Sequence, residues 1–253
     1  MNNQRSVLVT GMSGLIGGAV RRQLEGSVEL RALNRRAVPG IHTLQADIGD
    51  LEAIAPAFEG IDTVVHLAAA IERNPPIDVL TRANLVGVYN VFEAARRAGV
   101  RRIIYASSGA TISGWENDEP YKAIVEGRYE DVPDSWPLIT HEWPVNPSGL
   151  YGSSKVWGEA LARQFVEESA LSILCLRIGM VRPEDKPLAA RDYAVWCSQR
   201  DIAHMVQLCI DAPNALDYAI LFVTSNNKWG YRDIEHSRLA VGYVPQDSAE
   251  DYR

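Results

Sequence analysis

The sequence has few cysteines, no excess of positive charge and no long apolar run. Its three cysteines, Cys175, Cys197 and Cys209, lie in apolar contexts without metal-ligand spacing, which predicts buried thiols in a reducing compartment and no metal site. Acidic residues outnumber basic ones by 32 to 25, and the net charge of -7 argues against a nucleic-acid or anionic-membrane partner. No apolar stretch approaches the ~20 residues of a membrane span, and a strand-like run near the start leaves no room for a leader peptide. We therefore expect a cytoplasmic protein.

Short apolar runs alternate with helix-like segments along the first two thirds of the chain. The predicted strands are Ser6–Thr10, Glu29–Asn34, His42–Gln45, Thr63–Leu67, Arg102–Ala106 and Ser172–Arg177. The predicted helices are Leu15–Leu24, Leu51–Phe58, Val79–Ala98 and Gly152–Glu168. Because parallel strands need crossover connections, this pattern predicts an α/β fold, a doubly wound parallel sheet of the Rossmann type with helices on both faces.

The rest of the chain is less regular. Residues 114–148 are rich in Trp, Pro and acidic residues, and they are too long for a plain connection, so we interpret them as a lid or a substrate-facing insertion. A helix near Asp201–Asp211 and a strand at Ala219–Val223 follow. We expect residues 1–177 to form the main domain and residues 178–253 to form a small lobe that packs on it.

Three glycines spaced three residues apart, Gly11, Gly14 and Gly17, lie between the first predicted strand and the first predicted helix. Backbone N–H groups at a helix start attract anions, and glycine lets a phosphate approach closely. Ligands of doubly wound sheets bind at the carboxyl ends of the strands, where this loop lies. The spacing therefore indicates a phosphate cradle, although glycines alone would also fit a flexible loop between any strand and helix.

Tyr151 and Lys155 stand four residues apart at the start of a predicted helix and so share one face. An ammonium near a phenol favours the phenolate and lowers the tyrosine pKa from its usual ~10. Such a tyrosine could take a proton from a substrate hydroxyl while a hydride leaves the same carbon. Ser108 follows the strand Arg102–Ala106, where its hydroxyl could hold the reacting oxygen against Tyr151. Taken singly, each feature also fits surface residues or a turn cap.

These motifs occur in the order seen in extended short-chain dehydrogenases/reductases, the NAD-dependent epimerase/dehydratase family. The chain resembles that family from Thr10-Gly11-x-x-Gly14-x-x-Gly17 to Tyr151-x-x-x-Lys155. The resemblance implies an NADP- or NAD-dependent enzyme in which Ser108, Tyr151 and Lys155 are catalytic. It also implies that the cofactor is bound by Gly11, Ser13, Gly14, Leu15, Ile16, Gly17, Asn34, Arg35, Arg36, Asp47, Ile48, Leu67, Ala68, Ala69, Asn84, Tyr151 and Lys155.

The end of the second predicted strand bears on the choice of cofactor. NAD-preferring sites have an acidic residue there for the ribose hydroxyls, whereas an arginine accommodates a 2′-phosphate. This chain has Asn34, followed by Arg35 and Arg36, so we predict NADP rather than NAD. The alternative is that Asn34 binds the ribose hydroxyls of NAD and the two arginines face water.

The segments after residue 175 resemble uronate dehydrogenases and their sugar-oxidising relatives. Arg191 and Trp196 stand in the register of an arginine and a tryptophan of that subgroup, which implies that Arg191 holds the substrate sugar. A guanidinium is well suited to a carboxylate or phosphate, and the alternative is a surface arginine near a core tryptophan. Ser108 and Gly109 are the other predicted substrate contacts. Gly109 and Ala110 depart from the subgroup, which has polar side chains there, and residues 114–148 form a longer insertion than the subgroup has.

We therefore predict hydride transfer between a nicotinamide cofactor and the hydroxyl or carbonyl of a sugar-type substrate, such as a uronate or an aldose. The alternative is an NDP-sugar epimerase or dehydratase that holds NAD tightly. A non-enzymatic NAD(P)-sensing regulator is a third possibility, and the presence of Tyr151 argues against it. A homodimer is also predicted, because helices at 79–98 and 152–168 pair in many relatives, and Trp157, Leu161 and Phe165 form a stripe that fits either an interface or core.

Overall fold

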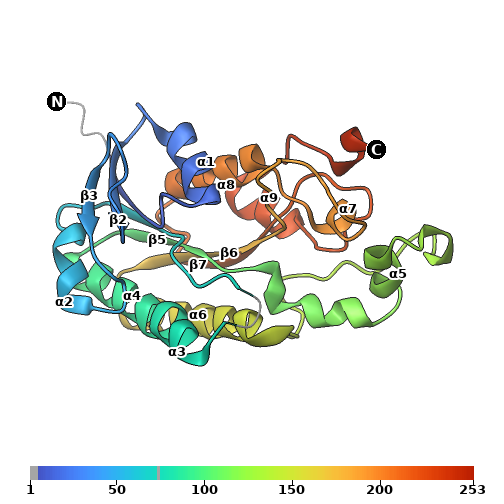
Figure 1. Ribbon diagram of the computed structural model, residues 1–253, viewed down its shortest axis with the longest axis horizontal. Helices are drawn as coiled ribbons and strands as arrows, with labels where there is room; N and C mark the ends of the chain where they lie inside the picture. Colours follow the sequence, from blue (N-terminus) through green and yellow to red (C-terminus); the bar gives the residue numbers. More distant parts are fainter. Residues whose placement is uncertain (1–4, 73–74) are drawn as a thin grey trace.

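The computed structural model describes residues 5–72 and 75–253 (Figure 1). In these residues seven strands form one parallel sheet in the order β3-β2-β1-β4-β5-β6-β7. The chain first builds outward from β1 to β3 and then returns to continue from β4 on the other side, which leaves a switch point between β1 and β4. The strands are β1 (Ser6–Thr10), β2 (Glu29–Asn34), β3 (His42–Gln45), β4 (Thr63–His66), β5 (Arg102–Ala106), β6 (Ser172–Ile178) and β7 (Tyr218–Val223). The predicted α/β Rossmann fold is confirmed.

Helices cover both faces of the sheet (Figure 1). Helices α1 (Leu15–Leu24), α8 (Gln199–Asp211) and α9 (Glu235–Val241) lie on one face, and α2 (Leu51–Ile54), α4 (Gly87–Ala98) and α6 (Gly149–Glu168) lie on the other. Successive side chains of a strand point to opposite faces, so Val7 and Val9 enter one core while Leu8 enters the other. Strands buried on both sides account for the continuous apolar runs in the sequence.

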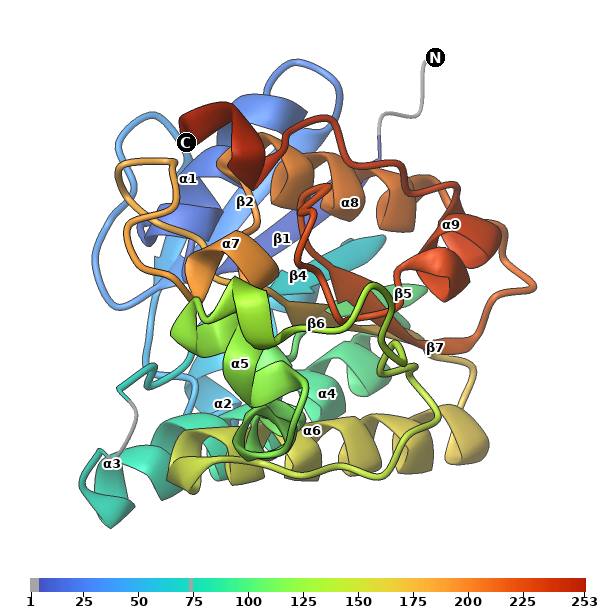
Figure 2. The same ribbon diagram turned by 90° about the vertical axis from the view of Figure 1, so that its right-hand side faces the viewer.

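Residues 109–139 build a third hydrophobic cluster beyond the sheet edge. Their short helices are η3 (Gly109–Thr111), η4 (Ser113–Asn117), α5 (Tyr121–Glu126) and η5 (Tyr129–Asp131). Buried side chains of this segment, such as Ile112 and Tyr121, pack with Val195 of α7 (Asp192–Val195) and with Tyr231. Figure 2 shows α5 beside α7. The insertion is therefore fixed to the C-terminal part of the chain by a core of its own, while its role as a lid stays a prediction.

Two predicted helices are divided in the structure. The segment predicted as one helix at Val79–Ala98 consists of α3 (Ile77–Leu80), a π-helix η2 (Thr81–Val86) and α4. The widened π-turn contains Asn84, whose side chain holds the loop after β4, as described below. The predicted helix Leu51–Phe58 is α2 followed by the 3₁₀ helix η1 (Ala55–Phe58), because Pro56 has no backbone N–H to donate.

The C-terminal region contributes to the sheet as well as to the lobe. Helix α8 packs on α1, and β7 pairs with β6 over Tyr218–Val223, so both elements belong to the main layers although they follow residue 177. The sheet therefore extends past the predicted domain boundary at residue 177, because β6 continues to Ile178 and β7 follows it in the sheet. The assignment of substrate binding to residues 178–253 stays a prediction.

Three further expectations concern the surface and the thiols. Cys175, Cys197 and Cys209 are free and buried, and burial raises the pKa of each thiol. No helix within residues 5–72 and 75–253 is long and apolar enough to cross a membrane. Phe165 is buried with its ring centroid 5.7 Å from that of Phe92, so this end of the predicted stripe faces the core of its own chain. The homodimer stays a prediction.

Candidate active site

The glycine loop is built by close backbone packing. Gly11 has φ +71°, and a Cβ there would lie 2.9 Å from the Ala68 nitrogen at the end of β4. A Cβ on Gly17 would lie 2.5 Å from the Gly11 oxygen, so α1 can approach the loop only with glycine at this position. Gly14 is the N-cap of α1, and no side chain in the described part of the chain caps it. The loop therefore fits a pyrophosphate, because the N–H groups of the first turn are left for an anion.

The exposed tip of this loop carries Ser13, Gly14 and Leu15, with Ile16 partly buried behind it. Asn34 braces the tip from the end of β2: its Oδ1 accepts from the Met12 nitrogen at 2.9 Å, and its Nδ2 donates to Ser13 Oγ at 2.9 Å. The sequence did not reveal this bracing role. Because the amide is already engaged, the neighbouring Arg35 and Arg36, both exposed, are the side chains left to meet a cofactor at this strand end.

Asp47 and Ile48 follow β3 on the same edge. Asp47 accepts from the Gly49 nitrogen at 2.7 Å and from Arg82 Nε at 3.0 Å, and these contacts hold the pKa of its carboxyl below the usual value. The Ile48 carbonyl accepts from Asn90 Nδ2 at 2.9 Å, which fastens this segment to α4. The two residues are thus fixed at one end of the predicted cofactor site.

The segment Leu67–Ala69 leaves the end of β4 beside the glycine loop. Thr10 Oγ1 accepts from the Leu67 and Ala68 nitrogens, each at 3.1 Å. Asn84 is fully buried: its Oδ1 accepts from the Ala70 nitrogen at 2.8 Å, and its Nδ2 donates to the Ala70 oxygen and to Ser154 Oγ, both at 3.0 Å. One side chain therefore ties the β4 loop to α6, the helix that carries Tyr151 and Lys155.

Helix α6 begins against the end of β5. A Cβ on Gly152 would lie 2.5 Å from the Ala110 oxygen, so glycine lets the first turn of α6 pack directly on η3. This contact brings Tyr151 close to Ser108, whose hydroxyl acts to lower the pKa of the phenol. Lys155 is buried, and its Nζ donates to the Ala106 oxygen at 2.7 Å while lying 5.6 Å from the centroid of the Tyr151 ring. The structure thus brings together the three residues predicted as catalytic.

The expected effect of Lys155 on Tyr151 differs in the structure. Burial raises the pKa of Tyr151 above its usual value, and the nearby Ser108 hydroxyl opposes that shift. The prediction that the tyrosine pKa is lowered is therefore wrong, because burial of the phenol is the largest effect on it. Burial also lowers the pKa of Lys155, to about 8.

A buried ion pair supports this corner of the site, and sequence reasoning missed it. Glu159 accepts from Arg177 Nε at 2.9 Å and Nη2 at 2.8 Å, and from Ser107 Oγ at 2.6 Å. The side chains of Glu159 and Arg177 are 5% and 2% exposed. One signal was present: Tyr151, Lys155 and Glu159 follow at four-residue intervals, so the carboxylate shares the face of the pair predicted as catalytic.

The predicted substrate contact Arg191 has partners that the sequence did not indicate. Arg191 donates from Nε and Nη2 to the two oxygens of Glu116, at 2.6 and 2.7 Å. The Tyr231 hydroxyl donates to Glu116 Oε1 at 2.5 Å. Glu116 lies in η4 of the insertion, so the predicted sugar contact is already paired with a carboxylate that the sequence gave no reason to single out.

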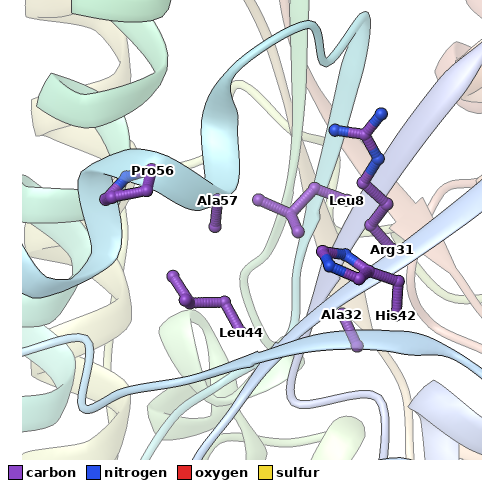
Figure 3. Close-up of a pocket in the computed structure, with 7 residues that line it drawn as sticks. All are labelled: Leu8, Arg31, Ala32, His42, Leu44, Pro56 and Ala57. Atoms are coloured by element: carbon purple, nitrogen blue, oxygen red, sulfur yellow. The ribbon is translucent and has the colours of Figure 1, made fainter.

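Figure 3 shows a small cavity elsewhere, between β2, β3 and η1. It lies beside the middle of β1, because Leu8 precedes the strand end Thr10 by two residues, and so it is separate from the candidate site. The residues that line it are Leu8, Arg31, Ala32, His42, Leu44, Pro56 and Ala57.

Comparison with known proteins agrees with this geometry. Residues 7–183 match the NAD dependent epimerase/dehydratase family, and the chain belongs to that family. It is 30% identical to NAD-dependent glucose-6-phosphate dehydrogenase of Haloferax volcanii, with 97% of this chain and 95% of the relative covered. It is 28% identical to L-arabinose 1-dehydrogenase (NAD(P)(+)) of the same organism, over 96% of this chain and 97% of that one.

Among solved structures, the chain is similar to the crystal structure of uronate dehydrogenase from Agrobacterium tumefaciens. The TM-score is 0.82 at 30% identity, and the match covers 98% of this chain and 87% of the other. The predicted resemblance to the epimerase/dehydratase family and to uronate dehydrogenases is confirmed. The protein is therefore an enzyme of the extended short-chain dehydrogenase/reductase class.

Proposed function

We propose that this enzyme is an NAD(P)-dependent dehydrogenase of a sugar or sugar acid. The observation that carries the proposal is the meeting of Ser108, Tyr151 and Lys155 at the carboxyl end of β5, on the sheet edge where the glycine loop leads into α1. The family's cofactor supplies or accepts a hydride at its nicotinamide when bound, and the Gly11–Gly17 loop and the β4 loop are the proposed holders of its pyrophosphate and ribose.

The side chains divide the remaining work. In the oxidation direction, Tyr151 takes the proton of the substrate hydroxyl while the hydride leaves the carbon that carries it. Ser108 holds the reacting oxygen, since its hydroxyl lies close enough to the phenol to act on its pKa. Lys155 keeps a positive charge close to the phenolate that must form, and its hydrogen bond to Ala106 fixes it there. Arg191, the predicted anion contact, is the N-cap of α7 and is hydrogen-bonded to Glu116 of the insertion.

A substrate panel tests the proposal. Uronic acids, aldoses, sugar phosphates and NDP-sugars are offered with NAD and with NADP, and the reduced cofactor is followed by its absorbance. We expect turnover among unactivated sugars or sugar acids, with one reduced cofactor formed per substrate oxidised. Turnover of NDP-sugars alone, with cofactor that survives purification and no net absorbance change, would favour the epimerase alternative and contradict the proposal.

We also propose that the enzyme prefers NADP, because Arg35 and Arg36 are exposed beside the loop tip and Asn34 leaves no carboxylate to repel a 2′-phosphate. Replacing both arginines by Gln removes charge-assisted contacts worth about 1.5–3 kcal/mol each, so NADPH affinity should fall at least about tenfold with little change for NADH. Fluorescence titration of each cofactor measures this.

The control replaces Arg163 and Arg200 by Gln, which removes two exposed charges from surface ion pairs away from the site. Equal or tighter binding of NADH by the unmodified enzyme would refute the preference. In that case Arg35 and Arg36 would face water in the complex.

A further inference from the structure

Arg232 is a buried arginine with unmet hydrogen-bonding capacity. Its side chain is 2% exposed, and its Nε and Nη1 have no hydrogen-bond partner in residues 5–72 and 75–253. The nearest acidic contact is Glu116 Oε1, 3.9 Å from Nη2. A buried guanidinium with unpaired donors is costly, because charge and N–H groups leave water without full compensation. A further hydrogen-bond acceptor for these donors would account for the buried charge.

The guanidinium lies directly over Gly109, the residue after Ser108. A Cβ on Gly109 would lie 2.3 Å from Arg232 Nη1 and 2.4 Å from both Cζ and Nη2. The guanidinium can therefore occupy this position only with glycine at 109, since even the methyl group of alanine would clash with it. The backbone around Arg232 is fixed, because Ile139 donates to the Tyr231 oxygen at 2.7 Å and accepts from the Asp233 nitrogen at 3.0 Å. The charge is thus held one residue from the proposed catalytic serine.

The charges of Arg232 and of the ion pair beside it do not balance. Both oxygens of Glu116 are taken by the Arg191 fork at 2.6 and 2.7 Å, and Tyr231 donates to the same carboxylate. Asp192, the acidic residue next to Arg191, is paired with Arg182 at 3.0 Å. The cluster of Glu116, Arg191 and Arg232 therefore has one negative and two positive charges. The excess charge is that of Arg232.

We propose that Arg232 contacts an anionic group of the substrate, so that the enzyme selects sugars with a carboxylate or a phosphate over neutral sugars. This rests on the proposed dehydrogenase function and names its substrate class. In this chain Arg191 holds Glu116, so the direct anion contact is assigned to Arg232, whose unpaired Nη1 lies against Gly109, the residue after Ser108. The site is assembled across the chain, because Glu116 belongs to η4 of the insertion and Arg191 is the N-cap of α7, which lies beside α5 (Figure 2).

Matched substrates test the proposal. The ratio of kcat/KM for D-glucuronate or D-glucose 6-phosphate to that for D-glucose is measured in the native enzyme and in Arg232→Gln. Losing a charge-assisted contact should reduce the ratio by about 10- to 150-fold, with the loss mainly in KM. Arg232→Lys keeps the charge without the planar fork and should fall between. Arg163→Gln, which removes an exposed charge on α6, is the matched control and should keep the native ratio.

Comparing D-glucuronate with D-glucose 6-phosphate shows whether the enzyme prefers a carboxylate or a phosphate on the sugar. A native preference for neutral sugars, or the same ratio in Arg232→Gln and the native enzyme, overturns the proposal and leaves the dehydrogenase function standing. If no sugar is oxidised, the proposed function fails, and binding decides about Arg232. With saturating cofactor, D-glucuronate or inorganic phosphate should raise the melting temperature of the native protein and not that of Arg232→Gln. Equal shifts, or none, overturn the assignment.

Discussion

Tyr151→Phe should lower kcat by about 10²–10⁴-fold, the range expected when a positioned proton-transfer group is removed. The phenol is the group that exchanges the substrate proton in the proposed reaction, and it lies near Ser108, just after β5. Phenylalanine keeps the ring in the first turn of α6 and removes only the hydroxyl. Initial rates with the substrate found in the panel measure the loss.

Cofactor titration distinguishes a catalytic defect from a structural one. We expect Tyr151→Phe to bind NAD(P)H nearly as tightly as the native enzyme, because the glycine loop and the β4 loop are held by other contacts. Tyr89→Phe is the matched control, since this tyrosine of α4 is 45% exposed and lies outside the site. Full activity of Tyr151→Phe would remove the proposed role of the residue.

The architecture could be predicted because its signals are local. Apolar runs bounded by turns gave the strands within one or two residues, and Gly11 and Gly17 are required by backbone approaches that no side chain can make. The corner that we propose as catalytic could also be predicted to come together, because Tyr151 and Lys155 share a helix face and Ser108 lies just after β5. These relations depend on near neighbours along the chain or on the common edge of a parallel sheet.

The contacts that were missed join segments far apart in the sequence. Glu116 and Arg191 are 75 residues apart, and Tyr231 is 115 residues from Glu116. Local pattern and spacing do not indicate which arginine will pair with a given carboxylate. The resemblance therefore pointed to Arg191, whereas in the structure Arg191 is paired with Glu116 and Arg232 has the excess charge. The pKa of Tyr151 was misjudged for a related reason, because burial depends on how η3 and α6 pack and not on the four-residue spacing to Lys155.

The second large effect is expected at the buried pair of Glu159 and Arg177. Arg177→Met should lower the free energy of unfolding by about 3–5 kcal/mol, because it leaves the Glu159 carboxylate buried with Ser107 as its remaining hydrogen-bond donor in the described part of the chain. Urea unfolding of the protein with and without the substitution measures this difference. Arg163→Met removes an exposed arginine that also pairs with a glutamate on α6, and it should cost less than about 1 kcal/mol.

Replacing both partners separates the cost of an orphaned charge from the value of the pair itself. Glu159→Gln combined with Arg177→Met leaves no buried charge at this place, so its loss should be clearly smaller than the sum of the two single losses. Additive losses would show that the ion pair is not the source of the effect.

The pair also acts on the proposed active site, because Glu159 opposes the lowering of the Lys155 pKa to about 8. In Glu159→Gln that pKa should fall further, so Lys155 should lose its charge at a lower pH and the alkaline limb of the activity profile should move the same way.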